Sequence, residues 1–256
     1  MDLRCGRWQN VLADVEPDSI ISDPPYSPKV HSGFRCHGDF VKDAQRRFAA
    51  QKNDFGKDGQ RRHGTASFGG LQYEPLSTES AEALAQRYRP AWWVLFGDHI
   101  TFRTWEAALL AAGEYVFAPV VWHRTGGTPR FQGDGPASVV EWICVARPRK
   151  KTTVGSLPGI YSCSQVKNDS VLKGQKPLAL MQDIIRDYSK PGDLILDPFA
   201  GSGTTLLAAA IEGRRAIGSE CDPATYSLAV KRLSKGYTPR MQLPAKAKPR
   251  QGDLGL

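Results

Sequence analysis

The sequence predicts an α/β fold in which a mostly parallel sheet is covered by helices on both faces. Short apolar runs alternate along the chain with longer amphipathic segments, as strands alternate with helices in such folds. A glycine-rich turn at 197–205 joins one apolar run directly to a helical segment. Hydrophobic residues make up 41% of the 256 residues and are spread over most of the length, so the chain can bury a normal core.

The first half of the chain contains two predicted strands and three predicted helices. Residues 19–22 form a short apolar strand that ends abruptly, because Pro24 and Pro25 follow it. From 27 to 75 the apolar periodicity is lost, and we expect a long basic insertion with a short helix at 39–51. The remaining predictions for this half are a helix at 78–89, a strand at 91–96 and a helix at 101–112 that ends at Gly113.

The second half continues the alternation. Apolar runs at 115–122 and 138–146 predict strands, because a loop rich in Gly and Pro separates them. After a connector, the pattern predicts a helix at 178–189, a strand at 193–197, a helix at 204–212, a strand at 215–220 and a helix at 223–234. We therefore expect one domain over 1–236 that contains the insertion, and a basic, disordered tail at 237–256.

The formal net charge of +8 is concentrated in two segments. Residues 27–75 contain nine Lys and Arg against five Asp and Glu, and residues 235–256 contain five against one, so each contributes +4. A neutral body with basic appendages suits a protein that contacts a polyanion, which makes nucleic acid the expected partner. Charge by itself leaves solubility as an equal alternative.

Cysteine usage and hydropathy favour a cytoplasmic protein. The five cysteines include no CxxC pair, which favours a reducing compartment. No apolar run reaches the roughly 18 residues that a membrane span needs. The spacing of His31, Cys36, His37 and His63 fits no common zinc site, so we expect no metal.

The turn at 197–205 predicts a site for an adenosine-containing cofactor. Gly201 and Gly203 free the backbone for a tight turn and for close approach of a ligand. Glu220 ends the next predicted strand, where its carboxylate can accept hydrogen bonds from both hydroxyls of a ribose. A dinucleotide is disfavoured, because Leu206 replaces the third glycine of GxGxxG and Asp197 would repel a pyrophosphate. Asp197 would instead suit the cationic end of S-adenosylmethionine.

A second motif, Asp23-Pro24-Pro25-Tyr26, predicts the place of a planar amine acceptor. The Asp23 carboxylate and the Pro24 carbonyl could each accept one hydrogen of the amine and so direct its nitrogen lone pair toward a methyl donor. Tyr26 offers a flat face on which an extruded base can stack. An Asp-Pro-Pro turn without any such role would be the simpler interpretation if no cofactor loop accompanied it.

With these two motifs, in this order, the sequence resembles the beta class of DNA amino-methyltransferases. The resemblance implies a Rossmann-like, seven-stranded, mostly parallel methyltransferase sheet with permuted motif order, S-adenosyl-L-methionine as cofactor and the N6 amine of adenine as acceptor. It implies that Lys176, in a Lys-Pro element, lies by the methionine carboxylate. Many relatives carry Gly-Asp at the end of the first strand, whereas here Arg7 follows Gly6.

The predicted site residues fall into three groups. The expected catalytic residues are Asp23, Pro24, Pro25 and Tyr26. The expected cofactor-binding residues are Lys176, Pro177, Asp197, Phe199, Ala200, Gly201, Ser202, Gly203, Thr204, Thr205, Glu220 and Cys221. The residues expected to contact DNA phosphates are Lys29, Arg35, Arg46, Arg47, Arg61, Arg62, Arg149 and Lys150.

Alternative functions remain open at this stage. The closest is methylation of the N4 amine of cytosine, whose enzymes more often carry Ser in place of Asp23. A module that binds nucleic acid but no longer catalyses is the second, and the replacement of an acid by Arg7 keeps it open. We expect a monomer or a homodimer, and the sequence does not indicate whether a restriction endonuclease accompanies it.

Overall fold

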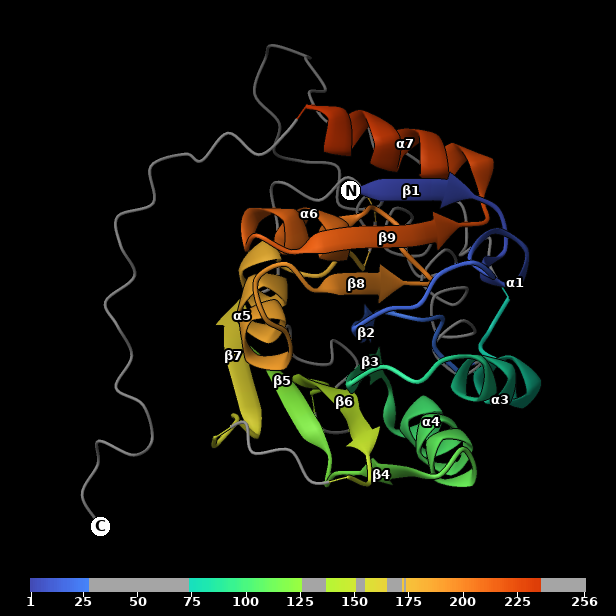
Figure 1. Cartoon of the computed structure of the whole chain (residues 1–256). Coiled ribbons are helices and arrows are strands. Elements are labelled where there is room, and N and C mark those ends of the chain that lie inside the picture. The colour runs from blue at the N-terminus through green and yellow to red at the C-terminus, as the bar shows by residue number, and fades with distance from the viewer. Residues whose placement is uncertain (28–73, 126–136, 151–154, 165–171, 173, 236–256) are drawn as a thin grey trace, which may run out of the picture.

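The structure is a computed structural model of the 256-residue chain. It describes residues 1–27, 74–125, 137–150, 155–164, 172 and 174–235. Figure 1 shows one twisted sheet between layers of helices, with β1 and α7 at one side of the molecule and β4 at the other.

The described strands all belong to one mixed sheet of nine strands. They are β1 (Asp2–Cys5), β2 (Ser19–Ser22), β3 (Trp92–Gly97), β4 (Glu114–Val116), β5 (Val120–Thr125), β6 (Val140–Pro148), β7 (Ile160–Ser164), β8 (Leu194–Asp197) and β9 (Arg215–Glu220). Their order is β1-β9-β8-β2-β3-β6-β5-β7, and β4 pairs with β6. β6 is antiparallel to β3, β4 and β5, and the other pairings are parallel. The predicted, mostly parallel sheet is confirmed.

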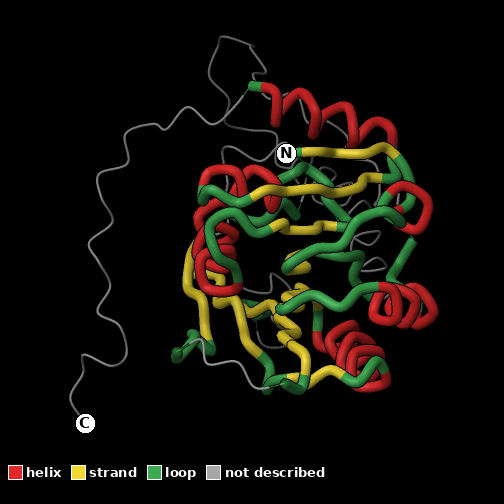
Figure 2. Tube along the Cα trace, viewed as in Figure 1, coloured by secondary structure: helices red, strands yellow, loops and turns green. Residues whose placement is uncertain are grey.

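The helices connect these strands across both faces of the sheet. The described helices are α1 (Trp8–Val11), α3 (Thr78–Arg87), α4 (His99–Ala111), α5 (Leu178–Tyr188), α6 (Thr204–Ile211) and α7 (Pro223–Ser234). Figure 2 shows these helices on both sides of the strands. Their bounds lie within a few residues of the predicted helices, except for α1, which the sequence pattern did not indicate.

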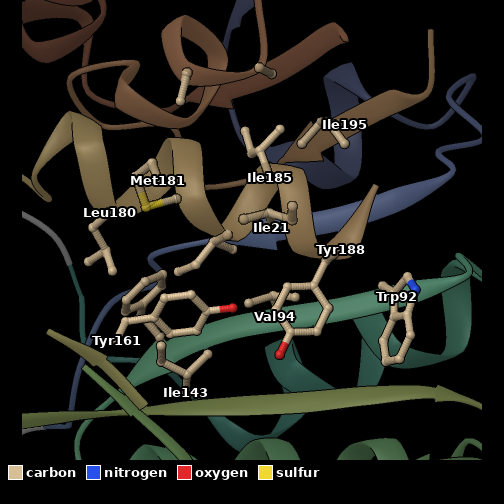
Figure 3. Close-up of a cluster of buried hydrophobic side chains, with 14 of the residues drawn as sticks. Ile21, Trp92, Val94, Ile143, Tyr161, Leu180, Met181, Ile185, Tyr188 and Ile195 are labelled. Atoms are coloured by element: carbon tan, nitrogen blue, oxygen red, sulfur yellow. The ribbon is translucent and has the colours of Figure 1, made fainter. Parts of the chain in front are cut away.

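The core consists of two clusters, one on each face of the sheet. Ile20 and Ile21 are both fully buried, but they belong to different clusters because successive side chains of a strand point to opposite faces. One cluster is covered by α5 and α6, and Figure 3 shows Met181 and Ile185 of α5 facing Ile21 and Val94 of the sheet. The other lies under α1, α3 and α4. Each such aliphatic side chain contributes roughly 1.5–3 kcal/mol through burial.

The expectation of seven strands is wrong, since the described residues form nine. β7 lies in the segment expected to be a connector, and it pairs in parallel with β5 at the sheet edge. As an edge strand with mostly exposed positions it carries Ser and Cys and lacks the apolar run that marks a buried strand. The three-residue β4 is separated from β5 by Pro119, which has no N–H to continue a ladder. The predicted single run at 115–122 is therefore two strands.

Two sets of expectations concern parts of the chain outside the described residues: the short helix at 39–51 and the tail at 237–256. Among the described helices, none combines the length and the apolar character that crossing a bilayer requires.

Candidate active site

The two predicted motifs meet at one edge of the sheet. β2 and β8 are parallel neighbours, with Ile20 opposite Leu196, so the segments that follow them emerge at the same carboxyl edge. The Ser22 hydroxyl donates a hydrogen bond of 2.5 Å to Oδ1 of Asp197. Since Asp23 follows Ser22 directly, the two loops are joined at their first residues.

The glycine loop has the backbone conformation that its sequence indicates. Gly201 and Gly203 have φ angles of 50° and 76°, in the left-handed region that favours glycine. A Cβ atom at Gly203 would lie 3.1 Å from the Leu233 side chain, whereas at Gly201 nothing but the Phe199 carbonyl oxygen, at 4.0 Å, would be nearby. The described surroundings therefore leave the backbone at Gly201 open to a ligand.

Glu220 ends β9 beside this loop and holds it in place. Its Oε2 accepts a hydrogen bond of 3.0 Å from the Gly201 amide, and its Oε1 accepts one of 2.8 Å from the Asp222 amide. A carboxylate oxygen has a second lone pair, so Glu220 can still accept hydrogen bonds from a ligand. Burial raises the pKa of Glu220, partly offset by these amide donors. Cys221, the next predicted cofactor residue, is exposed.

Asp197 is a buried acid whose partners, among the described residues, are uncharged polar groups. Its side chain accepts hydrogen bonds from the hydroxyl of Ser22 and the amide of Phe199, and the hydroxyl of Thr205 stabilises its charge. Burial raises its pKa to about 6, and the nearby charge of Asp23 acts in the same direction. A cation placed beside this carboxylate would gain strong electrostatic stabilisation.

The hydroxyl groups of Ser202 and Thr204 interact with α7. They lie 3.0 Å apart, and the Arg232 guanidinium donates to both of them and to the Ser202 carbonyl oxygen. These side chains fix the loop against the helix that follows β9, and their predicted contact with a cofactor stays a prediction. Nothing in the sequence marked Arg232, which lies in the last turn of an ordinary amphipathic helix.

The Asp23-Pro24-Pro25-Tyr26 segment lies against a buried lysine. Lys176 Nζ is 2.6 Å from Asp23 Oδ2, 3.1 Å from Tyr26 Oη and 3.2 Å from Glu141 Oε2. The Tyr26 hydroxyl donates a hydrogen bond of 2.5 Å to the same Glu141 oxygen. Asp23, Tyr26, Glu141 and Lys176 are called the acceptor cluster below.

Burial and charge shift the pKa values of the acceptor cluster in different directions. Burial raises the pKa of Asp23, and Lys176 offsets this only in part. Burial also raises the pKa of Tyr26 well above its usual value, so the phenol stays protonated and remains a donor. For Glu141 and Lys176 the opposite charges outweigh burial, so the pKa of Glu141 is lowered and that of Lys176 is raised.

A second carboxylate anchors the far end of the loop at 23–27, which follows β2 and is called the acceptor loop below. Asp98, at the end of β3, accepts hydrogen bonds from the Ser27 hydroxyl and amide through Oδ2. Its Oδ1 accepts the amides of Ile100 and Thr101 and so caps α4. The loop is thus held at Ser22, in the middle by Lys176 and at Ser27.

The structure differs from the sequence-based site in two placements. Lys176 lies in the acceptor cluster, with its ammonium group on Asp23 and Glu141; a contact with a cofactor carboxylate stays a prediction. Arg149 and Lys150 follow the end of β6, and the antiparallel register pairs that end with the start of β3, at the opposite edge from Asp23. The structure does not bring them to the two loops.

Other predicted residues lie outside the described part of the chain: Lys29, Arg35, Arg46, Arg47, Arg61 and Arg62. His31, Cys36, His37 and His63 also lie there. Within the described residues, no group of three or more His, Cys, Asp or Glu side chains is placed to hold a metal ion.

Sequence reasoning missed Glu141, Asp98 and Arg232 as site residues. Glu141 had an available signal, since an acid in the apolar run of β6 is out of place unless it is paired. Asp98 also had one, because Asp followed three residues later by Thr101 at a helix start is a capping pattern.

Comparison with known proteins agrees with this geometry. A family model described as DNA methylase, N6_N4_Mtase, matches residues 18–231. The type II methyltransferase M.HindIII of Haemophilus influenzae is 52% identical over 59 residues, which are 23% of this chain and 19% of that protein. M.HinfI, from the same species, is 30% identical over 141 residues, which are 46% of this chain and 39% of that protein. The matched regions are thus less than half the length of these relatives.

The fold is also found among solved structures. The crystal structure of an M1.HpyAVI–SAM complex superposes with a TM-score of 0.64 at 21% identity, and the match covers 91% of this chain and 98% of that one. Because the family model spans most of the sequence, including both loops and the strands that carry them, this chain belongs to the N6/N4 DNA methylase family.

Proposed function

We propose that this protein transfers a methyl group from S-adenosylmethionine to the N6 amine of adenine in DNA. The observation that carries the proposal is the state of Asp23. Its Oδ2 is held by Lys176, whereas its Oδ1 is buried and, among the described residues, has no hydrogen-bond partner. An unpaired buried acceptor is costly. A donor supplied by the substrate, such as an amine hydrogen, would satisfy it.

The residues around the glycine loop fit the proposed cofactor. Bound S-adenosylmethionine would supply an electrophilic methyl group carried on a positively charged sulfur. The Asp197 carboxylate is a buried anion suited to the cationic end of that molecule, and Glu220 can accept hydrogen bonds from its ribose. The open backbone at Gly201 allows close approach. M1.HpyAVI, which has the same fold, was solved as a complex with SAM.

Asp23 would act on the amine in two ways. By accepting one amine hydrogen at Oδ1, while the Pro24 carbonyl accepts the other, it would draw the nitrogen lone pair out of the ring and aim it at the methyl group. After transfer the nitrogen carries an extra proton, which the Asp23 carboxylate can take, consistent with its raised pKa. Tyr26 would stack on the base, which must leave the duplex to reach this edge.

The test is methyl transfer to unmethylated DNA by the purified protein, followed by digestion to nucleosides and mass analysis. We expect N6-methyladenine. N4-methylcytosine would establish the alternative acceptor, which the family model also covers. DNA binding without transfer by a folded protein would favour the non-catalytic module.

Asp23→Ala should lower the transfer rate by about 10²-fold or more, because it removes the acceptor that activates the amine. The dissociation constant of S-adenosylmethionine, measured by calorimetry, should stay close to that of the wild type. Glu82→Gln, a change at an exposed helical position, is the control. Full activity in Asp23→Ala would remove this residue from the mechanism.

A further inference from the structure

Lys176 has its ammonium group fully occupied by the acceptor cluster. A lysine ammonium has three protons, and three oxygen atoms surround this one: Asp23 Oδ2, Tyr26 Oη and Glu141 Oε2, at 2.6, 3.1 and 3.2 Å. The side chain is only 6% exposed. Two of its protons are donated to Asp23 and Tyr26 and its charge is paired with Glu141, so a contact with a carboxylate of the cofactor would require the acceptor cluster to rearrange.

Glu141 connects the parts of the acceptor cluster. Its Oε2 accepts a hydrogen bond from the Tyr26 hydroxyl and forms an ion pair with Lys176, and its Oε1 lies 3.5 Å from Arg124 Nη1 on the neighbouring strand β5. Glu141 belongs to β6, close to the position where Trp142 pairs with Gly97 of β3. A carboxylate on a sheet strand is a firmer support than one on a loop, because the strand's backbone is fixed on both sides.

Aromatic rings enclose this arrangement. Lys176 Nζ lies 5.1 Å from the centre of the Phe96 ring and 6.0 Å from that of Trp122. Both rings are buried and come from β3 and β5. In such surroundings charge interactions are screened less than in water, so the positions of the four polar side chains depend strongly on one another.

We propose that Glu141 and Lys176 are positioning residues for the methyl acceptor, an inference that depends on the proposed function. Lys176 occupies Oδ2 of Asp23 and thereby presents Oδ1 to the amine. Glu141 fixes the Tyr26 ring through its hydroxyl, so that the stacking face and the accepting oxygen are held in one geometry before the base arrives. Glu141 also keeps Lys176 on Asp23.

The same geometry gives opposite electrostatic effects at Asp23. The charged and titratable groups that face it are Lys176 from the segment before α5, Glu141 from β6, Tyr26 from its own loop and Asp197 from β8, with Arg124 behind Glu141. Glu141 raises the pKa of Asp23 and Lys176 lowers it. The pKa of Asp23 must therefore fall when the charge of Glu141 is removed and rise when the charge of Lys176 is removed.

The experiment compares Glu141→Gln with a matched control, Glu114→Gln. Glu114 is likewise a glutamate on a sheet strand and is buried, but β4 pairs with the far end of β6, away from the acceptor cluster. Glu141→Gln should lower kcat by about 10- to 100-fold, because the base and Asp23 lose their alignment. The KM for S-adenosylmethionine should stay within about twofold of the wild type, since the glycine loop is untouched. The control should retain the wild-type kcat.

The pH profile provides a signature that loss of packing would not give. The acid limb of kcat should move to lower pH in Glu141→Gln, because a negative charge near Asp23 is gone, and to higher pH in Lys176→Met, because the cation is gone. Carboxyl carbon NMR titration of Asp23 checks the same two directions without any turnover. If Lys176→Met does not fold, the Glu141→Gln titration alone still decides the sign.

Two results would overturn the inference: a kcat for Glu141→Gln equal to that of Glu114→Gln, or a loss that appears entirely in the KM for S-adenosylmethionine. The second would place Lys176 and Glu141 at the cofactor. Failure of the proposed function is separate, because it would appear in the wild-type protein as absence of methyl transfer to DNA.

Discussion

Asp197 illustrates how a single residue can lower the folding stability of the protein without ligand and still favour binding of a cationic ligand. It is 2% exposed, and among the described residues its partners are hydroxyls and an amide. Burial raises its pKa from 3.8 to about 6. An acid whose folded pKa is above its unfolded value stabilises the fold most at low pH, and that contribution is lost as pH rises through the folded pKa.

Asp197→Asn should therefore stabilise the protein without ligand at pH 7.5 but not at pH 4. A shift of about two pKa units corresponds to roughly 3 kcal/mol at most, so Tm should rise by several degrees at pH 7.5. Thermal melts between pH 4 and 7.5 measure this, with the exposed Glu82→Gln as control. Binding of S-adenosylmethionine, followed by calorimetry, should weaken at the same time. A stability gain that does not change with pH would contradict the electrostatic explanation.

At the scale of elements, the sequence predicted those strands and helices that carry a local signal. The proline stop after Ser22 and the glycine turn at 201–203 are short-range patterns, and the elements that they bound are in the structure. The capping pattern at Asp98 is also local, but it was overlooked, so the predicted helix began at 101 and not at His99. β7 was missed because an edge strand need not be apolar.

Contacts between distant elements could not be predicted in the same way. Lys176 pairs with a residue 153 positions away, and Tyr26 with one 115 positions away. Their partners depend on the order of the strands, which brings β6 and the segment before α5 to the loop after β2. The sequence thus predicted both loops of the site, but it did not predict Glu141 and Asp98, the two acids that support the acceptor loop.

The carboxylate at the start of α4 links helix stability to the acceptor loop, and the two roles can be separated. Ser27→Ala removes the hydroxyl contact with Asp98 but keeps the amide contact and the cap on Ile100 and Thr101, so kcat should fall several-fold with little change in Tm. Asp98→Ala removes both, so the free energy of unfolding should also fall by about 1 kcal/mol. Thermal melts and steady-state kinetics of the two variants test this. An equal loss of stability in both would show that Ser27 supports the fold and not the loop alone.

At the scale of the whole molecule, DNA binding should depend more on where the positive charges lie relative to the active-site edge than on the net charge. The basic segment at 27–75 begins directly after Tyr26 in the sequence, whereas Arg149 and Lys150 lie at the opposite edge of the sheet. DNA bound at the edge where Asp23 lies would therefore be on the other side of the sheet from Arg149 and Lys150.

Replacing Arg46, Arg47, Arg61 and Arg62 by Gln should weaken DNA binding and flatten its dependence on salt. Each phosphate contact that is lost reduces the slope of log K against log salt by about 0.9. The matched variant, Arg149→Gln with Lys150→Gln, should change the slope less. Fluorescence anisotropy with a labelled duplex at several salt concentrations measures both. A slope that only the second variant alters would place DNA on the other edge.

The chain leaves the acceptor loop and returns to it at almost the same point, since the amide of Leu76 donates a hydrogen bond of 3.4 Å to the Tyr26 carbonyl oxygen. The entropic cost of closing a loop between two such neighbouring points grows only with the logarithm of the loop's length. Changing the length of the stretch between Tyr26 and Leu76 therefore alters the loop-closure entropy by only about 0.6 kcal/mol for each doubling.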